Sequence, residues 1–202
     1  MDKPLNEQTY GDETVSTFFK RPTVDIAEHW ALFESGTTVL DAGCGEGRNA
    51  IFLAEKGLVV DAFDISWTGL EKARQIAADK GVNVNLFRED LAKLAFRKTY
   101  GVILSHGVLH LCEKAARDLF LERAMKHTLI GGHNAIGIFT NKLPTTPEMA
   151  PFAKSLFDVG ELPAKYAKWE ILHHFEGIIE DSRGGKLHKR GYESIIARKI
   201  GN

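Results

Sequence analysis

One short segment constrains the fold of this chain more than any other: residues 39–49, which read VLDAGCGEGRN. Its apolar start is typical of a buried strand, and the residues after Gly47 fit the start of a helix. Glycines between a strand and a helix permit positive φ and let a ligand touch bare backbone, while the helix N-terminus offers N–H donors to an anionic group. The segment therefore predicts an α/β fold with a nucleotide-like ligand on this turn.

The rest of the chain supports that class. From residue 37 onward, short runs rich in Val, Ile and Phe alternate with helix-like segments, a pattern that predicts a mostly parallel sheet covered by helices. The predicted strands are residues 37–41, 58–64, 82–87, 100–105 and 132–140.

Turn and cap residues mark the predicted helices. One helix is expected over residues 23–34 and another over 48–56, and a third has Ser66 as its N-cap and ends at Gly81. A further helix over 113–129 is expected to be closed by Gly131 and Gly132.

The C-terminal part does not show this alternation of strands and helices. Two β-like runs, residues 169–179 and 189–199, flank a turn-rich link that contains Gly184 and Gly185. Such a pair predicts an antiparallel hairpin added to the parallel sheet.

Length and charge limit the organisation and the partners. A chain of 202 residues hides roughly 70% of its unfolded surface on folding, enough for one core, so we expect a single domain with residues 1–22 as an N-terminal lid. The net charge of −1, from 26 basic and 27 acidic residues, excludes sustained attraction to nucleic acid or anionic lipid. Without an apolar leader or a membrane span, the chain is expected to be cytoplasmic.

The glycine spacing separates two ligand classes. Dinucleotide-binding turns have the pattern G-x-G-x-x-G, whereas Arg48 stands where the third glycine would be, and Gly47 comes one residue earlier. Asp41, two residues before Gly43, would place negative charge beside a pyrophosphate. The pattern therefore disfavours a nicotinamide oxidoreductase and favours a cationic ligand.

Two further carboxylates follow later strands. Asp64 lies 21 residues after Gly43, a position from which a carboxylate accepts hydrogen bonds from ribose hydroxyls. Asp90 is placed to accept from an exocyclic amine, and Leu91 to cover a base. Three carboxylates at strand ends predict a ribonucleoside ligand without phosphate, and S-adenosyl-L-methionine fits this description.

These residues resemble the class I S-adenosylmethionine-dependent methyltransferases. VLDAGCGEGRN, VDAFDIS, FREDLAKL and LIGGH are similar to the successive motifs of that family, and GCGEGRNAIFLAEKG with WEILHHFEGIIE resembles its tellurite-resistance, or TehB-like, group. The resemblance implies a Rossmann-like fold: a mostly parallel seven-stranded sheet with a C-terminal antiparallel hairpin and helices on both faces.

The resemblance also implies roles for individual residues. Asp41 would hold the methionine ammonium group, Asp64 the ribose and Asp90 the adenine amine. Arg48 would meet the methionine carboxylate or be an exposed helix-end residue, and Asn49 would cap the turn or touch the ligand. The other residues expected at the donor are Gly43, Cys44, Gly45, Gly47, Ile65, Leu91, Ser105 and His106.

The residues expected to act on the acceptor come from the C-terminal half. Glu180 and Asp181 occupy the position at which the TehB-like group has a His-Arg pair, so basic residues across the hairpin are expected to substitute, with solvated turn charges as the alternative. The predicted catalytic residues are His110, Arg183, His188 and Arg190. No metal site is expected.

The functional prediction is methyl transfer from S-adenosyl-L-methionine to a small soft nucleophile such as tellurite, selenite or a thiol. A small-metabolite O-, N- or C-methyltransferase is the alternative. A sensor that binds the donor without turnover is the alternative outside the enzyme class. The expected partner is a small-molecule acceptor, and the sequence indicates no oligomeric state.

Overall fold

The computed structural model describes residues 21–147, 150–183 and 186–201. It divides into two compact units, the first ending at Leu104 and the second beginning at Ser105. Nearly all of the predicted N-terminal lid lies outside the described residues, and the single domain stays a prediction.

Within its described residues, the first unit contains four helical segments and four strands, of which the last continues to His106. Their bounds are α2 Val24–His29, η1 Trp30–Leu32, β1 Thr38–Ala42, α3 Arg48–Glu55, β2 Val59–Asp64, α4 Trp67–Asp79, β3 Val84–Arg88 and β4 Tyr100–His106.

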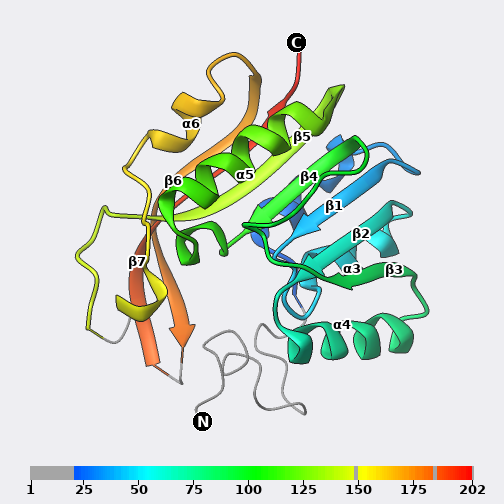
Figure 1. Cartoon of the computed structure of the whole chain (residues 1–202), viewed down its shortest axis with the longest axis horizontal. Helices are drawn as coiled ribbons and strands as arrows, with labels where there is room; N and C mark the ends of the chain where they lie inside the picture. The colour runs from blue at the N-terminus through cyan, green and yellow to red at the C-terminus, as the bar shows by residue number, and fades with distance from the viewer. Residues whose placement is uncertain (1–20, 148–149, 184–185, 202) are drawn as a thin grey trace. The chain divides into compact units, whose positions relative to one another are not determined.

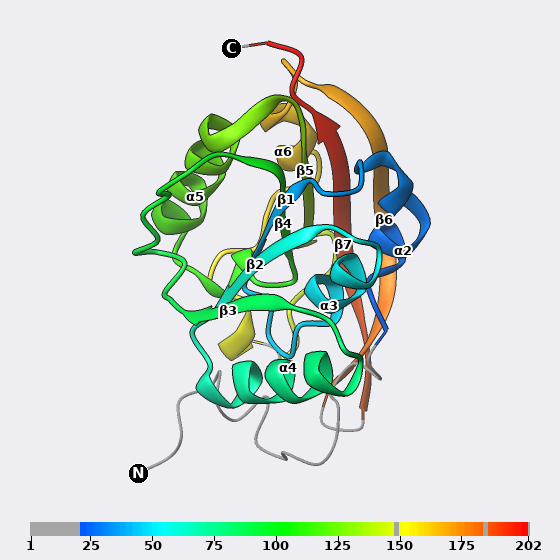
Figure 2. The ribbon, with the colours of Figure 1, turned by 90° about the vertical axis from the view of Figure 1, so that its right-hand side faces the viewer.

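The strands of this unit follow the order β3-β2-β1-β4 and are all parallel. β1 and β4 are almost entirely buried, as expected for parallel strands covered on both faces. Figures 1 and 2 show β1, β2 and β3 side by side, with α3 and α4 next to each other. The carboxyl ends of β1 and β2 lie together, since Ala42 pairs with Phe63.

Local signals explain two of these helices. Ser66 caps α4 as predicted, because its hydroxyl accepts a hydrogen bond of 3.1 Å from the Gly69 N–H. The helix predicted over 23–34 is shorter: α2 ends at His29, whose φ of −116° is not helical, and a 3₁₀ turn follows. The Phe33 N–H bonds to the Trp30 carbonyl and tightens that turn.

The second unit contains η2 Leu109–Leu111, α5 Lys114–His127, β5 Thr128–Thr140, η3 Ala150–Phe152, α6 Glu161–Lys165, β6 Glu170–Arg183 and β7 Lys186–Arg198. Its strands follow the order β5-β7-β6 and are antiparallel, which confirms the predicted C-terminal hairpin. Figure 1 shows α5 lying along β5. Within the described residues, no helix combines the length and the apolar character needed to cross a bilayer.

The predicted end of the last long helix is wrong. α5 stops at His127, and Thr128 is already extended, with ψ of 132°. The Thr128 hydroxyl bonds to the Ala124 carbonyl and to Asn134 Oδ1, so the helix passes directly into β5 without a glycine cap. Gly131, with φ of 80°, lies inside the strand.

The predicted link of the hairpin is also shorter than expected. β6 continues to Arg183 and β7 begins at Lys186, so most residues assigned to the link are paired strand. Glu180 pairs with Lys189, and Asp181 pairs with His188. Gly184 and Gly185 predict a turn-rich link, but the ladder of this long hairpin extends the paired strands beyond the predicted runs.

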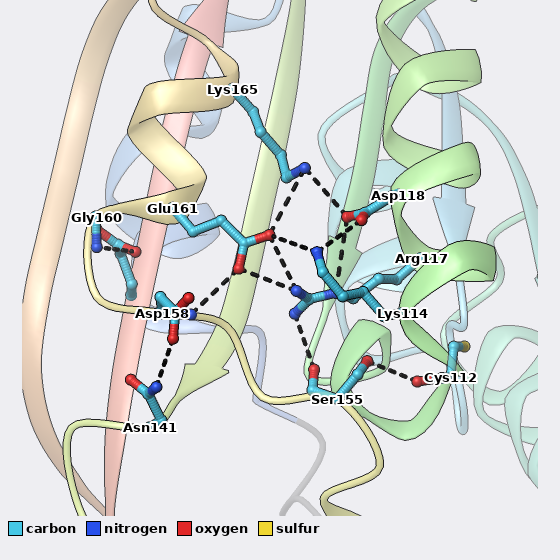
Figure 3. A network of polar contacts seen from close by, with 11 residues as sticks. Cys112, Lys114, Arg117, Asp118, Asn141, Ser155, Asp158, Gly160, Glu161 and Lys165 are labelled. Carbon is cyan, nitrogen blue, oxygen red and sulfur yellow. Dashed lines mark hydrogen bonds and ion pairs between the residues drawn. The ribbon is translucent and has the colours of Figure 1, made fainter.

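A polar network joins α5 to α6 in the second unit (Figure 3). Arg117 is only 1% exposed, and its Nη2 lies 3.0 Å from both carboxylate oxygens of Glu161. Its Nη1 donates to the Ser155 carbonyl at 2.9 Å, and its guanidinium stacks 3.6 Å from the centre of the Phe157 ring. The network therefore fixes the segment after β5 to the rest of the unit.

Arg117→Met is expected to destabilise the chain by about 2 kcal/mol, because it removes a buried charged partner and leaves the Ser155 carbonyl without this donor. Lys114 and Lys165 stay within 3.6 Å of Glu161 and limit the loss. Urea unfolding measures the change. Arg198→Met is the matched control, since Arg198 forms an exposed pair with Glu170 and its loss should cost less than about 1 kcal/mol. Equal losses in the two variants would contradict the prediction.

Candidate functional site

The glycine turn between β1 and α3 has the conformation that its sequence predicts. Gly43, Gly45 and Gly47 have φ values of 76°, 56° and 79°. Such angles are strained for residues with a Cβ, so the third glycine serves the turn itself and caps α3. The N–H groups of Gly43 and Cys44 both donate to the Phe63 carbonyl at 2.9 Å, which holds the turn against the end of β2.

Asp64 binds the same turn from the end of β2. The carboxylate is 7% exposed and accepts a bond of 2.8 Å from the Gly45 N–H on one oxygen and one of 2.8 Å from the Ser66 N–H on the other. Asp64 thus holds the backbone of the turn against the end of β2.

Asp41 lies beneath the turn, at the end of β1, and is 2% exposed. One carboxylate oxygen accepts a hydrogen bond of 3.1 Å from the Ala50 N–H in α3. Burial raises the pKa of Asp41 from 3.8 to about 7, although this bond and the Arg48 charge lower it, while the Asp64 charge raises it further. A buried carboxylate of this kind would be stabilised by a cation and opposed by an anion.

Four more residues predicted at the donor follow β2 and β3 or begin α3. Asp90 is half-buried two residues after β3, where one carboxylate oxygen accepts from the Ala92 N–H at 3.0 Å, and Leu91 is buried beside it. Ile65 is 42% exposed, and Arg48 is half-buried at the start of α3. Their contacts with a donor stay predictions.

Asn49 and Cys44 have clear structural roles. Asn49 Oδ1 accepts from the backbone N–H of Thr23 at 2.8 Å and from its hydroxyl at 3.2 Å, so it joins the start of α2 to α3. Burial raises the pKa of the Cys44 thiol well above its usual value, and the charges of Asp41 and Asp64 raise it further. A neutral, buried thiol makes Cys44 a small packing residue of the turn and not a nucleophile.

The second unit places two of the predicted catalytic residues around one aromatic ring. The imidazole of His110 meets Phe139 edge-on, with 4.6 Å between ring centres, and the Arg190 guanidinium stacks 3.3 Å from the centre of the same ring. His188 is half-buried two residues before Arg190 on β7. The side chain of Arg183 lies outside the described side chains.

Sequence reasoning missed two residues at this place, Phe139 and Tyr192. They face each other across β5 and β7, with ring centres 5.7 Å apart. The Tyr192 hydroxyl also lies 3.3 Å from Nδ1 of His106, a residue that the sequence predicts at the donor. Ser105, the other residue predicted at the end of β4, is completely buried. Gly137, inside β5, was the available signal, since glycine inside a strand marks a close approach.

Comparison with known proteins assigns the family. The family model described as tellurite resistance protein TehB matches residues 22–194. The chain belongs to the TehB family. This confirms the predicted resemblance to TehB-like methyltransferases.

Two curated relatives resemble the TehB-family chain over most of its length. The "probable S-adenosyl-L-methionine-dependent methyltransferase TehB" of Haemophilus influenzae strain 10810 is 26% identical over 80% of this chain and 57% of its own. The "2-heptyl-1-hydroxyquinolin-4(1H)-one methyltransferase" of Mycobacteroides abscessus is 26% identical over 82% of this chain and 76% of its own. The chain therefore spans little more than half the length of the Haemophilus relative.

A solved structure confirms the fold class of this TehB-family chain. The crystal structure of TehB from Haemophilus influenzae matches with a TM-score of 0.81 and 21% identity, and covers 96% of this chain and 66% of that one. The fold is the Rossmann-like methyltransferase fold, with seven strands in the described residues and a C-terminal antiparallel hairpin.

Proposed function

We propose that this chain is an S-adenosyl-L-methionine-dependent methyltransferase with a small-molecule acceptor. The observation that carries the proposal is the pair of buried carboxylates, Asp41 and Asp64, on either side of a glycine turn. A pyrophosphate would bring negative charge to a carboxylate that burial already disfavours as an anion, whereas a sulfonium ligand with an ammonium group brings positive charge. Membership of the TehB family and the names of the relatives support the same donor.

Under this proposal, the donor contacts follow the sequence predictions. Asp64 accepts from the ribose hydroxyls, Asp41 holds the ammonium group, and Asp90 with Leu91 binds the adenine. Arg48 meets the methionine carboxylate, and the backbone of the glycine turn borders the methionine chain. Ser105 and His106 offer their carbonyls to the ammonium group. The donor supplies an electrophilic methyl group, so the protein has to align an acceptor and exclude water.

For the acceptor, we propose a small soft nucleophile such as tellurite, selenite or a thiol. Arg190 and His110 support this choice, because both nitrogen-bearing side chains pack on the apolar ring of Phe139, where Arg190 is 7% exposed and His110 is completely buried. Such side chains would hold the oxygens of a chalcogen oxyanion while its lone pair attacks the methyl carbon. His188 and Arg183 are proposed to contribute from the same hairpin.

A second candidate is O-methylation of a small metabolite. The observation that favours it is the contact between His106 and Tyr192, since an acceptor that carries a proton needs a group to receive that proton. The name of the Mycobacteroides abscessus relative specifies a substrate of this class, 2-heptyl-1-hydroxyquinolin-4(1H)-one. A sensor that binds the donor without turnover is the third candidate.

Calorimetry with S-adenosyl-L-methionine, S-adenosylhomocysteine and NADH tests the donor. We expect binding of the first two at micromolar strength and none of NADH. Radiolabelled methyl transfer to tellurite, selenite, dithiothreitol and 1-hydroxyquinolin-4(1H)-one then separates the acceptor classes. Tight NADH binding would contradict the proposed donor, and donor binding without transfer to any acceptor would favour the sensor.

A further inference from the structure

A histidine and a tyrosine from distant parts of the second unit meet above a glycine. Nδ1 of His106, at the end of β4, lies 3.3 Å from the hydroxyl of Tyr192 on β7. A Cβ added to Gly137 on β5 would overlap with the Tyr192 hydroxyl and lie 2.5 Å from His106 Nδ1. Gly137 does not have positive φ, so its lack of a side chain serves to make room for this pair.

Aromatic rings line this place on the hairpin. The Tyr192 ring lies 5.7 Å from the Phe139 ring and 6.3 Å from the Phe175 ring, measured between centres. Phe175 is 40% exposed, and both Tyr192 and His106 are half-buried. The two polar groups therefore stand among aromatic side chains and keep part of their surface accessible.

His106 is the last residue of β4. Ligands of parallel sheets bind at the carboxyl ends of the strands, so this position suits a residue that acts on a ligand.

We propose that Tyr192 and His106 form a proton-accepting pair for an acceptor with a weakly acidic hydroxyl group on a planar ring. The proposal rests on the proposed methyltransferase function in its second form, O-methylation of a small metabolite, and names the acceptor class that this part of the molecule fits. Tyr192 is the catalytic residue that touches the acceptor hydroxyl, and His106 is the positioning residue behind it. The ring of Phe175, which is 40% exposed, would stack with a planar acceptor.

In the proposed step, a lone pair of the acceptor oxygen forms a bond to the methyl carbon. The carbon–sulfur bond breaks, and its electron pair stays on sulfur as neutral S-adenosylhomocysteine. The acceptor proton passes to the Tyr192 oxygen while the Tyr192 proton passes to His106 Nδ1. The products are the methyl ether, S-adenosylhomocysteine and an imidazolium ion that returns its proton to water. General bases of this kind contribute about 10²–10⁴ in rate.

The test compares Tyr192→Phe with Tyr100→Phe. Tyr100 donates to Asp61 in the first unit at 2.9 Å, so its variant loses a tyrosine hydroxyl away from the pair. Methyl transfer is measured with 1-naphthol and catechol, which carry the proton, and with selenite, whose selenium lone pair attacks without losing one. We expect Tyr192→Phe to lower kcat for the hydroxyl acceptors at least about 100-fold. The dissociation constant of the donor and the rate with selenite should change less than about threefold, as in Tyr100→Phe.

A second variant tests the pair without removing either group. Gly137→Ala must displace the Tyr192 hydroxyl or His106, so it should produce the same selective loss with hydroxyl acceptors. Circular dichroism confirms that each variant is folded. Equal losses with selenite and 1-naphthol, or no loss with either, would overturn the proposal. A wild-type protein that methylates selenite and neither hydroxyl acceptor would also overturn it while leaving the methyltransferase function intact; absence of donor binding would refute that function itself.

Discussion

Asp41→Asn is expected to stabilise the chain by up to about 4 kcal/mol at pH 8, while it weakens binding of S-adenosyl-L-methionine. Burial raises the pKa of Asp41 from 3.8 to about 7, and a tenfold change in proton affinity between the unfolded and folded states corresponds to about 1.4 kcal/mol. At pH 8 the folded wild-type chain carries this buried charge, which the amide removes. The amide oxygen can still accept the hydrogen bond from the Ala50 N–H.

The pH dependence gives the sign of this effect. Between pH 4 and pH 7 the folded state binds the Asp41 proton more tightly than the unfolded state does, so this group makes the chain less stable as the pH rises through that window. Urea unfolding of the wild type and of Asp41→Asn should therefore agree near pH 4 and diverge up to about pH 7. A constant difference over this range would contradict the prediction.

The affinity for the donor should fall in Asp41→Asn, although the stability of the chain rises. If Asp41 meets the ammonium group, loss of its charge costs about 1.5–3 kcal/mol of binding free energy at pH 8. Asp61→Asn is the matched control: burial alone would raise the pKa of Asp61, but hydrogen bonds from Lys98, Asn85 and Tyr100 lower it. Removing that charge should destabilise the chain at neutral pH and leave calorimetric binding of the donor unchanged.

Asp64→Ala is expected to destabilise the chain by about 2–6 kcal/mol and to weaken donor binding beyond calorimetric detection at micromolar donor. The variant leaves the N–H groups of Gly45 and Ser66 without their acceptor, and each buried N–H left unpaired costs about 1–3 kcal/mol. Urea unfolding and calorimetry measure the two effects.

Asp79→Ala is the matched control for this variant. Asp79 lies exposed at the end of α4 and accepts a bond of 2.8 Å from Gln75, so its removal should change stability by less than about 0.5 kcal/mol. Removal of Asp64 should also lower the pKa of Asp41, since the Asp64 charge raises it. Full donor affinity in a folded Asp64→Ala protein would refute the ribose role.

Local features made part of the site predictable from sequence. The glycine turn depends on residues within ten positions of each other, and Asp41 and Asp64 end strands whose apolar pattern is plain, so spacing alone located them. The cap at Ser66 is likewise a local signal, and the structure confirms it.

Long-range pairing made the remainder unpredictable. Phe139 meets Tyr192 only because β5 and β7 pair in one register, across more than fifty residues of chain. The end of α5 depends on Thr128, whose bond to Asn134 overrides the nearby glycines as helix terminators. The length of the hairpin likewise follows from cross-strand pairing and not from composition.

The double engagement of Asp64 has an evolutionary consequence. The carboxylate that is proposed to select the ribose also holds the neighbouring backbone through its bonds to the N–H groups of Gly45 and Ser66. A substitution of Asp64 therefore changes both ligand affinity and the stability of the turn. A substitution of Asp90 disturbs less of the fold, because its bond to the Ala92 N–H stays within its own loop. A change of coenzyme specificity during evolution should therefore begin at the residues proposed to bind the adenine.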